Sequence, residues 1–376
     1  MTAEIALLNK SAVALAADSA ATLSSRDRQE KVFNSEDKLF ELSMTQPIGV
    51  MIFNSTTFME TPVHLLIKKY RSLGREFNTV DDAAKNFREY LRDFANTLDE
   101  DVRNRNFTRL VQFPMQLARS RALKELQEAL LPSVKRGEGL EGIKGVAAGI
   151  EALDTPAIAE GASKFYIETF KSAPFASFTG TKALKIIDKM GKQTKKKLSS
   201  QGLTETENEL ILSFIRSSAT SSGSTGFVIA GFAKTELFPS LRSFEIDGML
   251  GGDLRFMNDS AEDITLSGTS AKIIPFAQQE MVDRFVSGID EISQNRIVEY
   301  CREQIRSLHS DLMSVLDVDD NDTTTHLQEI LDKAGDTYIE NLKSEGFSDI
   351  KEASRKEMEG MVESPSDKSC STTGPS

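Results

Sequence analysis

The chain has 376 residues, of which 39% are hydrophobic and 27% charged. This is the composition of an ordinary soluble protein, long enough for two domains or for one domain with a large insertion. Its formal net charge of −12 argues against general nucleic-acid binding, because phosphate contacts need a clustered positive field. Cys301 and Cys370 form no disulfide framework or metal-binding spacing, and no apolar run has the length of a membrane span. We therefore expect a cytoplasmic protein without membrane contact.

Strand patterns fill the first part of the chain, up to about residue 57. Residues 4–8 (EIALL) and 11–17 (SAVALAA) flank Asn9-Lys10, a spacing that predicts a tight hairpin. Neither run alternates cleanly between apolar and polar residues, so we expect both strands to be buried on both faces. The segment 31–43 (KVFNSEDKLFELS) predicts a second strand pair with its turn at 34–37, and 47–54 (PIGVMIFN) predicts a further strand.

Helical spacing then dominates from residue 59 to about residue 217. The apolar residues at 63, 66, 67 and 70 predict a helix over 62–73. Thr79 and Asp82 approximate a capping box at the start of a second helix over 79–100, and Thr204 with Glu207 marks a later helix start. Residues 134–163 are rich in Gly and Ala and predict a hinge or loop. The segment 217–226 (SSATSSGSTG) predicts a flexible junction.

The β pattern returns after this junction. TGFVIAGFA, LRSFEIDG, DLRFMN and EDITLSG predict four short strands separated by Gly- and Asp-containing turns. From Ala271 onward we expect helix, with Phe276, Met281, Phe285 and Ile289 on one face. The last residues, 364–376, are polar and predict a disordered tail.

The order of strands, helices, strands and helices predicts an α+β fold in which both ends of the chain build one sheet-based core. We expect residues 1–58 to form the first part of this core and 222–310 the second part. Residues 59–221 form a helical insertion that includes the first helix layer, and 311–363 form a helical extension.

Four features of the sequence lie at or near the ends of predicted strands, and their order along the chain is informative. Thr2 becomes the first residue once Met1 is cleaved, and Asp18 ends the second strand in LAADSAAT. Lys31 opens KVFNSEDKL, and Ser267-Gly268 lie in LSGTSA, which we expect to be a turn before a helix. At these positions the sequence resembles the proteasome β-type family of N-terminal nucleophile (Ntn) hydrolases, including the bacterial proteasome-like peptidases, over roughly residues 2–57 and 224–290. The resemblance implies an Ntn-hydrolase-like αββα sandwich.

The resemblance also implies roles for these residues. Thr2 would be the nucleophile, Lys31 would supply a positive field held by Asp18, and Ser267, supported by Gly268, would bond the α-amine. The backbone N–H that stabilises the oxyanion would come from Asn54 or Ser55, where the family has Gly. Asn tolerates unusual backbone angles better than most residues.

The chemistry of an N-terminal Thr gives an independent reason to consider this site. A Thr hydroxyl needs a base to become nucleophilic, and a free α-amine titrates near ~7.7–8. A nearby ammonium disfavours protonation of that amine and so keeps more of it in the basic form.

Two functional hypotheses remain open at this point. The first is a threonine-type peptidase or amidohydrolase that needs no metal or cofactor and acts on a peptide or protein. The second is an inactive scaffold of the same fold whose helical insertion binds a protein partner. Either version leaves open a homo-oligomer and, by analogy with the family alone, an ATPase partner.

Overall fold

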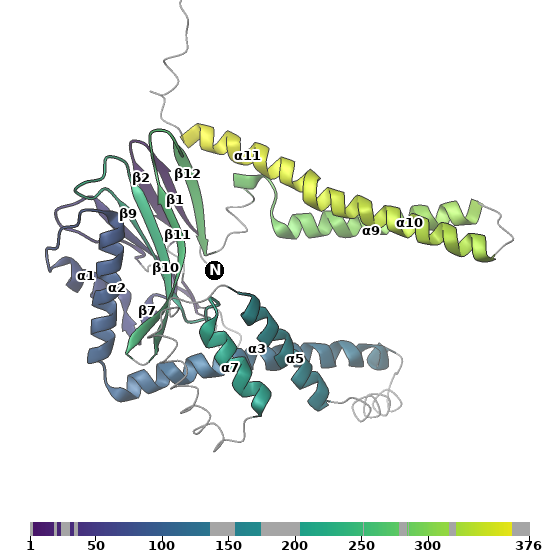
Figure 1. The fold of residues 1–376 in the computed structure, drawn as a ribbon, viewed down its shortest axis with the longest axis horizontal. Helices are drawn as coiled ribbons and strands as arrows, with labels where there is room; N and C mark the ends of the chain where they lie inside the picture. Colours follow the sequence, from purple (N-terminus) through teal and green to yellow (C-terminus); the bar gives the residue numbers. More distant parts are fainter. Residues whose placement is uncertain are drawn as a thin grey trace, which may run out of the picture. The chain divides into compact units, whose positions relative to one another are not determined.

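The computed structural model describes residues 3–18, 21–23, 31–33, 37–135, 155–173, 204–250, 252–277, 284, 286–315 and 321–362. It combines antiparallel sheets with long helices (Figure 1), in agreement with the expected α+β class. The chain folds into two compact units. We call residues 1–39, 236–240 and 263–376 the terminal unit, and residues 40–235 and 241–262 the central unit.

The terminal unit is built around a three-stranded antiparallel sheet. Its strand order is β12 (Ala271–Ala277), β1 (Ala3–Asn9) and β2 (Val13–Ala17). The register of β1 runs from Ala3 opposite Ala277 to Asn9 opposite Ala271. Residues 271–277, which we expected to be helical, therefore share a sheet with the first two strands of the chain. A separate two-stranded sheet pairs β3 (Ala21–Leu23) with β4 (Lys31–Phe33).

The first hairpin forms as predicted, with its turn displaced by one residue. Leu8 pairs with Val13, and the Asn9 N–H donates to the carbonyl of Ala12 at 3.0 Å. The Asn9 side-chain Oδ1 accepts hydrogen bonds from the N–H groups of Ser11 and Ala12, each at 2.8 Å. Asn9 thus stabilises the turn with its own side chain, and the turn is centred on Lys10 and Ser11.

The expectation that β1 and β2 are buried on both faces is wrong. Along β2, residues alternate between half-buried and exposed, and the exposed positions are Ala14 and Ala16. Strand β2 is the edge of its sheet, so its outer face meets solvent. Alanine on that face conceals the alternation, because it reads as apolar in the sequence although it is small enough to be tolerated in water.

The helices of the terminal unit form a hairpin and a continuation. Helix α9 (Glu291–Val315) packs on α10 (Asn321–Asn341), which continues through a π-helical turn η1 (Leu342–Gly346) into α11 (Phe347–Val362). Helix α11 packs against β12 and β1, and the Asn9 side-chain amide donates to the carbonyl of Val362 at 3.0 Å. A small apolar core joins α9, α10 and α11 at Val298, Ile339 and Phe347.

The central unit contains a five-stranded antiparallel sheet. Its strand order is β11 (Asp253–Asp263), β10 (Ser240–Leu250), β9 (Thr225–Gly231), β6 (Ile48–Asn54) and β5 (Leu39–Glu41), with a small β7 (Thr57–Phe58) and β8 (Thr61–Pro62) hairpin nearby in sequence. Strand β9 is buried at every position, as expected for a central strand with an apolar sequence.

Two helices of the predicted first layer cover this sheet (Figure 1). Helix α1 (Val63–Arg71) and helix α2 (Val80–Thr97) share one apolar core with β6, β9 and β10. Thr79 caps α2 in a complete capping box with Asp82, as predicted. Phe87 lies at the centre of this core, where its ring meets the Phe227 ring edge-on at 5.4 Å.

Three further helices build a second apolar core in the central unit. These are α3 (Glu100–Lys135), α5 (Thr155–Ser172) and α7 (Glu205–Arg216), and α7 begins with the predicted capping box of Thr204 and Glu207. Their core includes Phe214 and reaches the sheet at Leu250 and Met257. The α5 segment corrects the expectation of a loop over 134–163, because at least residues 155–163 are helical.

Three predicted strand assignments are also corrected. Strand β4 pairs with β3, which precedes it, whereas β5 joins the five-stranded sheet. The segments DLRFMN and EDITLSG contribute to one strand, β11, instead of two. Residues 271–277 form strand β12 where we expected helix, because each of them finds a ladder partner in β1.

The boundaries of the units also differ from the predicted segments. The first boundary falls after residue 39, not after 58, because β6 pairs with β9 and shares the central core. The predicted tail, 364–376, lies outside the described residues.

Candidate functional site

A buried ion pair lies beside the start of strand β1. Lys38 Nζ is 2.8 Å from Glu4 Oε1, and the side chains of Lys38 and Glu4 are 4% and 0% exposed. The second carboxylate oxygen, Glu4 Oε2, is buried and has no hydrogen-bond partner among the described residues. Because a buried carboxylate oxygen without a partner is costly, this oxygen is an acceptor available to a donor.

The strand explains why a Glu is buried here. Side chains alternate along a strand, and Glu4 shares its buried face with Ala6 and Leu8, both 0% exposed. Leaving Glu4 charged in such a place requires a cation, which Lys38 supplies from the segment between β4 and β5.

Asp18 occupies the position that the sequence led us to expect. Ala17, the last residue of β2, pairs with Glu4, so Asp18 follows at the end of the hairpin where β1 begins. Its side chain is exposed. The end of the hairpin therefore carries Asp18 directly after β2 and Glu4 on β1.

Ser267 does not share this location. It is exposed in the turn between β11 and β12, and Ala271, four residues later, pairs with Asn9 at the far end of β1. Six residues of strand separate Asn9 from Ala3, which corresponds to about 20 Å. The expectation that Ser267 bonds an amine at residue 2 is therefore contradicted by the register, and the turn precedes a strand, not a helix. Within this turn the Gly268 N–H donates to Thr265 Oγ1 at 3.0 Å.

The predicted contact between Thr2 and Lys31 cannot be followed to its end, because only one of the two residues is described. Thr2 lies outside the described residues, immediately before Ala3. Lys31 opens strand β4 as predicted and pairs with Leu23. The predicted contact between Thr2 and Lys31 therefore stays a prediction.

Asn54 and Ser55 belong to the central unit. Asn54 ends β6 with a left-handed φ of 62°, in keeping with its expected tolerance of unusual backbone angles. The Ser55 N–H donates to the carbonyl of Ser224 at 3.1 Å. The Ser55 backbone donor is therefore already engaged in extending the ladder between β6 and β9.

Sequence reasoning overlooked Lys38 and Glu4. Lys38 belongs to the Asp-Lys pair in KVFNSEDKL, but nothing in its local pattern distinguishes it from a surface lysine. Glu4 reads as an outward-facing residue of an apolar strand. Only the ion pair between them shows that both are buried.

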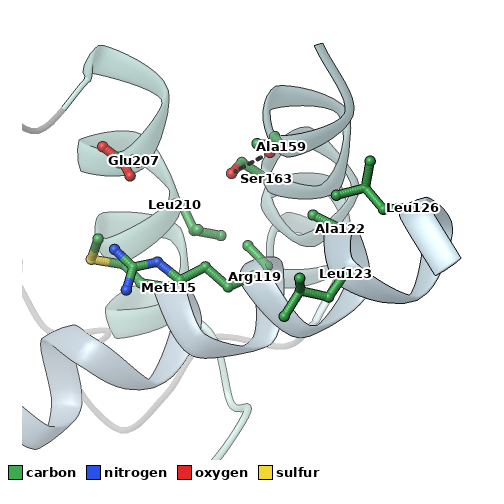
Figure 2. Close-up of a pocket in the computed structure, with 10 residues that line it drawn as sticks. Met115, Arg119, Ala122, Leu123, Leu126, Ala159, Ser163, Glu207 and Leu210 are labelled. Atoms are coloured by element: carbon green, nitrogen blue, oxygen red, sulfur yellow. Dashed lines mark hydrogen bonds between the residues drawn. The ribbon is translucent and has the colours of Figure 1, made fainter. Parts of the chain in front are cut away.

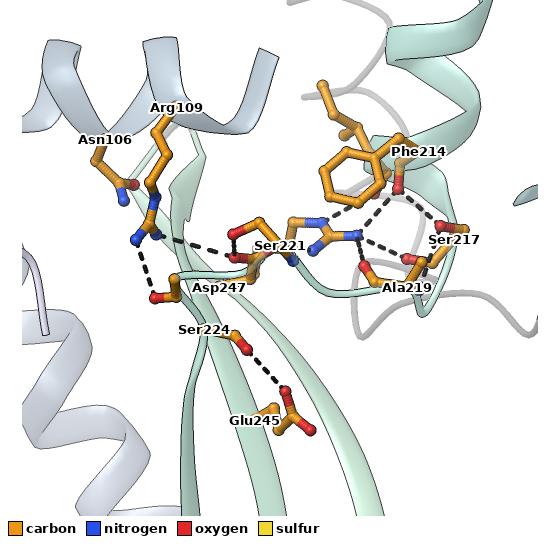
Figure 3. Close-up of polar contacts among 12 residues, drawn as sticks. Asn106, Arg109, Phe214, Ser217, Ala219, Ser221, Ser224, Glu245 and Asp247 are labelled. Carbon is orange, nitrogen blue, oxygen red and sulfur yellow. Dashed lines mark hydrogen bonds and ion pairs between the residues drawn. The ribbon is translucent and has the colours of Figure 1, made fainter. Parts of the chain in front are cut away.

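A second buried polar cluster lies in the central unit (Figure 3), around Asp247 of β10 and Arg255 of β11. Both side chains are 0% exposed, and Arg255 Nη1 is 2.6 Å from Asp247 Oδ2. The Arg255 guanidinium also donates to backbone carbonyls at and beyond the end of α7, those of Phe214, Ile215, Ser217 and Ala219. Arg255 therefore caps α7 and fixes the start of the following loop.

The same cluster immobilises the Ser- and Gly-rich segment that we expected to be flexible. Ser221 donates to Asp247 from both its backbone N–H, at 2.9 Å, and its hydroxyl. Arg109 of α3 donates to the carbonyl of Gly223 at 2.9 Å, an approach that a side chain at Gly223 would obstruct. Burial raises the pKa of the Asp247 carboxyl, an effect that the Arg255 charge and the Ser221 hydrogen bonds oppose. Every charged atom here has protein partners, which is the pattern of a structural cluster.

A pocket of about 330 Å³ lies between α3, α5 and α7 (Figure 2). Its lining is mainly apolar and comes from Met115, Ala118, Ala122 and Leu126 of α3, Ala159 of α5 and Leu210 of α7. Arg119, Glu207 and the Ser163 hydroxyl supply the polar groups. Glu207 is engaged in capping α7, and Ser163 donates to the carbonyl of Ala159. The pocket can therefore accept an apolar group, with Arg119 beside it.

Within the described ranges, no three acidic, His or Cys side chains are grouped so that they could hold a metal ion. None of the helices in those ranges combines the length and apolarity that a membrane-spanning segment needs. No known family model matches the sequence, and comparison with curated proteins and with solved structures finds no significant relative.

Proposed function

We propose that the chain is an N-terminal threonine hydrolase with an Ntn-like αββα core, which cleaves amide bonds, most simply those of a peptide, through Thr2. The proposal rests on the buried ion pair between Glu4 and Lys38, because Glu4 is two residues after Thr2 in the sequence. Residues i and i+2 of an extended strand share a face, so extending β1 back by one residue would put the Thr2 side chain on the same side as Glu4. Asp18 ends the neighbouring strand at the same level.

In this proposal Lys38, in place of Lys31, is the buried ammonium of the site. Lys38 is buried and paired with Glu4, whereas Lys31 belongs to the two-stranded β3–β4 sheet and not to the sheet that contains β1. An ammonium near the α-amine of Thr2 favours the neutral, basic form of that amine. Glu4 Oε2 is the acceptor that can receive an N–H from the same amine and orient its lone pair toward the Thr2 hydroxyl.

The reaction proceeds by acyl transfer. The α-amine takes the proton of the Thr2 hydroxyl while Oγ attacks the amide carbon, and the proton then passes to the departing amine. The resulting ester is attacked by water, whose proton goes to the α-amine. Cleavage of the ester bond releases the carboxylate product and restores the Thr2 hydroxyl.

The test combines intact-mass spectrometry with a covalent probe directed at N-terminal Thr, an epoxyketone or β-lactone. We expect removal of Met1 and one adduct on the first peptide. Thr2→Ala should abolish the adduct and turnover, and Thr2→Ser should retain part of the rate. Lys38→Met should lower the rate at least 100-fold, whereas the matched variant Lys31→Met should stay within threefold of wild type. Retention of Met1 excludes the mechanism, because the α-amine is then not on Thr2.

The alternative function, an inactive scaffold whose helical insertion binds a partner, is favoured by the pocket between α3, α5 and α7. Leu123, 59% exposed, lies at its margin, so an apolar side chain of a partner could enter beside an exposed Leu. Binding of the dye anilinonaphthalene sulfonate tests this. Fluorescence enhancement that Ala122→Leu removes supports a binding pocket, and an unchanged enhancement in that variant assigns the dye to another surface.

A further inference from the structure

An exposed apolar patch lies along the α9–α10 hairpin of the terminal unit. Among the described residues, nine of the seventeen large apolar side chains that are exposed lie on α9, α10 and α11. Seven of them belong to the hairpin itself, and we call six of these, all except Ile292, the hairpin patch: Ile297, Tyr300, Leu308 and Leu312 of α9, and Ile330 and Tyr338 of α10. Such a concentration of exposed apolar side chains marks an interaction surface.

The two helices of the hairpin cannot bury the whole patch between themselves. Val298 and Ile305 of α9 face α10, where Ile339 meets the first and Gly335 the second. A side chain at Gly335 would approach Ile305 Cγ2 to 2.8 Å, so the two helices are already in close contact. The apolar stripe of α9 is therefore wider than the surface that α10 can cover.

Both helices present their exposed residues on the same side of the hairpin. At 100° per residue, Ile297 and Leu308 lie about 80° before the α10-facing direction of α9. On α10, Tyr338 lies about 80° and Ile330 about 160° before the inward direction, taken midway between Gly335 and Ile339. The helices are antiparallel, as the contacts of His309 with Asp332 and of Ile305 with Gly335 show. Offsets in the same sense on antiparallel helices fall on one side, so Ile297, Leu308 and Tyr338 share one side of the hairpin. Leu312 lies between this side and the α9–α10 contact, and Tyr300 and Ile330 lie at the outer edges of the patch.

The patch has the size and charge that pairing with a second copy requires. Each side chain exposes on the order of 100 Å², so two copies would bury about 1,200 Å², the lower limit of a specific interface. On α10 the residues between and beside the exposed pair on this face are uncharged, namely Ala334, Thr337 and Asn341. This matters because two copies that each carry −12 must meet at a surface free of repulsion.

We propose that the hairpin patch is a homodimer interface, in which the hairpins of two copies pack into a four-helix bundle. A bundle of two helical hairpins buries the stripes of all four helices in one core, which removes the exposed apolar surface from both copies at once. The proposal is independent of any catalytic activity.

Sedimentation velocity on the full-length protein, from about 1 to 100 μM, tests the proposal. We expect a species of twice the 41.5 kDa chain mass. Leu308→Glu and Tyr338→Glu should each raise the dimer dissociation constant at least 100-fold, since each buries a carboxylate in the bundle core. Circular dichroism should show unchanged helix content, because both side chains are exposed in the single chain.

Ile292→Glu is the matched control. Ile292 lies on the same helix and is 46% exposed, but at 100° per residue it lies about 150° from the direction of Ile297 and Leu308. We expect it to leave the dissociation constant within threefold of wild type. A wild-type protein that stays monomeric to 100 μM overturns the proposal. So does a dimer that Leu308→Glu leaves intact, or one that Ile292→Glu weakens equally.

Discussion

Two ion pairs of the described residues, Glu4–Lys38 and Asp247–Arg255, are both buried but have opposite surroundings. Asp247 and Arg255 share hydrogen bonds with Ser221 and with four backbone carbonyls at and beyond the end of α7. Glu4 and Lys38 share a single contact of 2.8 Å, and Glu4 Oε2 has no partner among the described residues. An ion pair whose polar atoms all have hydrogen-bond partners holds the surrounding backbone in place. An ion pair with an unpartnered oxygen can still accept a hydrogen bond from another group.

Arg255→Leu should give the largest effect on stability. It leaves Asp247 buried without its counter-ion and removes the donor to the carbonyls that follow α7. We expect a loss of about 5 kcal/mol in the free energy of unfolding, measured by urea denaturation. Arg255→Lys should recover little, because one ammonium cannot reach the acceptors that the planar guanidinium reaches. A loss below about 1 kcal/mol would show that the cluster is not structural.

Lys38→Met should cost less, about 3 kcal/mol, because Glu4 then loses one partner instead of a network. The double variant Glu4→Gln/Lys38→Met has no buried charge and should be close to wild type in urea denaturation. A double variant as unstable as Lys38→Met would mean that the pair is as fully integrated as the Asp247 cluster, and the contrast between the two pairs would fail.

Arg109→Gln should cost at most about 1 kcal/mol. Its side chain is 43% exposed and lies 3.9 Å from Asp247 Oδ1, which accepts a closer hydrogen bond from the Ser221 hydroxyl. Thermal unfolding followed by circular dichroism measures the change. A loss equal to that of Arg255→Leu would show that the exposed arginine, not the buried one, holds the loop.

Asp290→Asn should have the smallest effect at neutral pH and a clear one in acid. Asp290 accepts hydrogen bonds from Arg284 and Ser293 at the start of α9, and Arg284 first and Ser293 next lower its pKa to about 2. A lowered pKa contributes stability above the unfolded value near 3.8, and the contribution disappears as pH falls through about 2. Melting temperatures measured between pH 2 and 5 should therefore fall less steeply in Asp290→Asn than in wild type. Equal slopes would contradict the role of the Arg284 contact.

Local signals allowed the sequence to predict much of the fold. The capping boxes at Thr79 and Thr204, the Asn9 hairpin and the first helix layer all depend on neighbours within a few residues. Strand β12 was read as helix because its β character comes from pairing with β1, whose residues lie at the other end of the sequence. The edge position of β2 was missed for a different reason, because the alanines on its exposed face count as apolar in the sequence.

The candidate site was harder to predict because burial of a charged residue depends on its partner. Asp18 could be placed from the hairpin alone. Glu4 and Lys38 lie 34 residues apart, and no pattern around either one indicates an ion pair. Ser267 was chosen from a motif, and the register of β12 moves it to the far end of β1.

The pairing of Ala3 with Ala277 has a consequence for the order of folding. At a synthesis rate of about 5–20 residues per second, β1 and β2 wait roughly 10–50 s for residues 271–277 to be made. A two-stranded hairpin is marginal in water, so during that interval its sheet face, including the buried side of β1, stays incomplete. If Thr2 is the nucleophile, the sheet that begins one residue after it is complete only once residue 277 has been made, so the enzyme cannot act before most of its own chain exists.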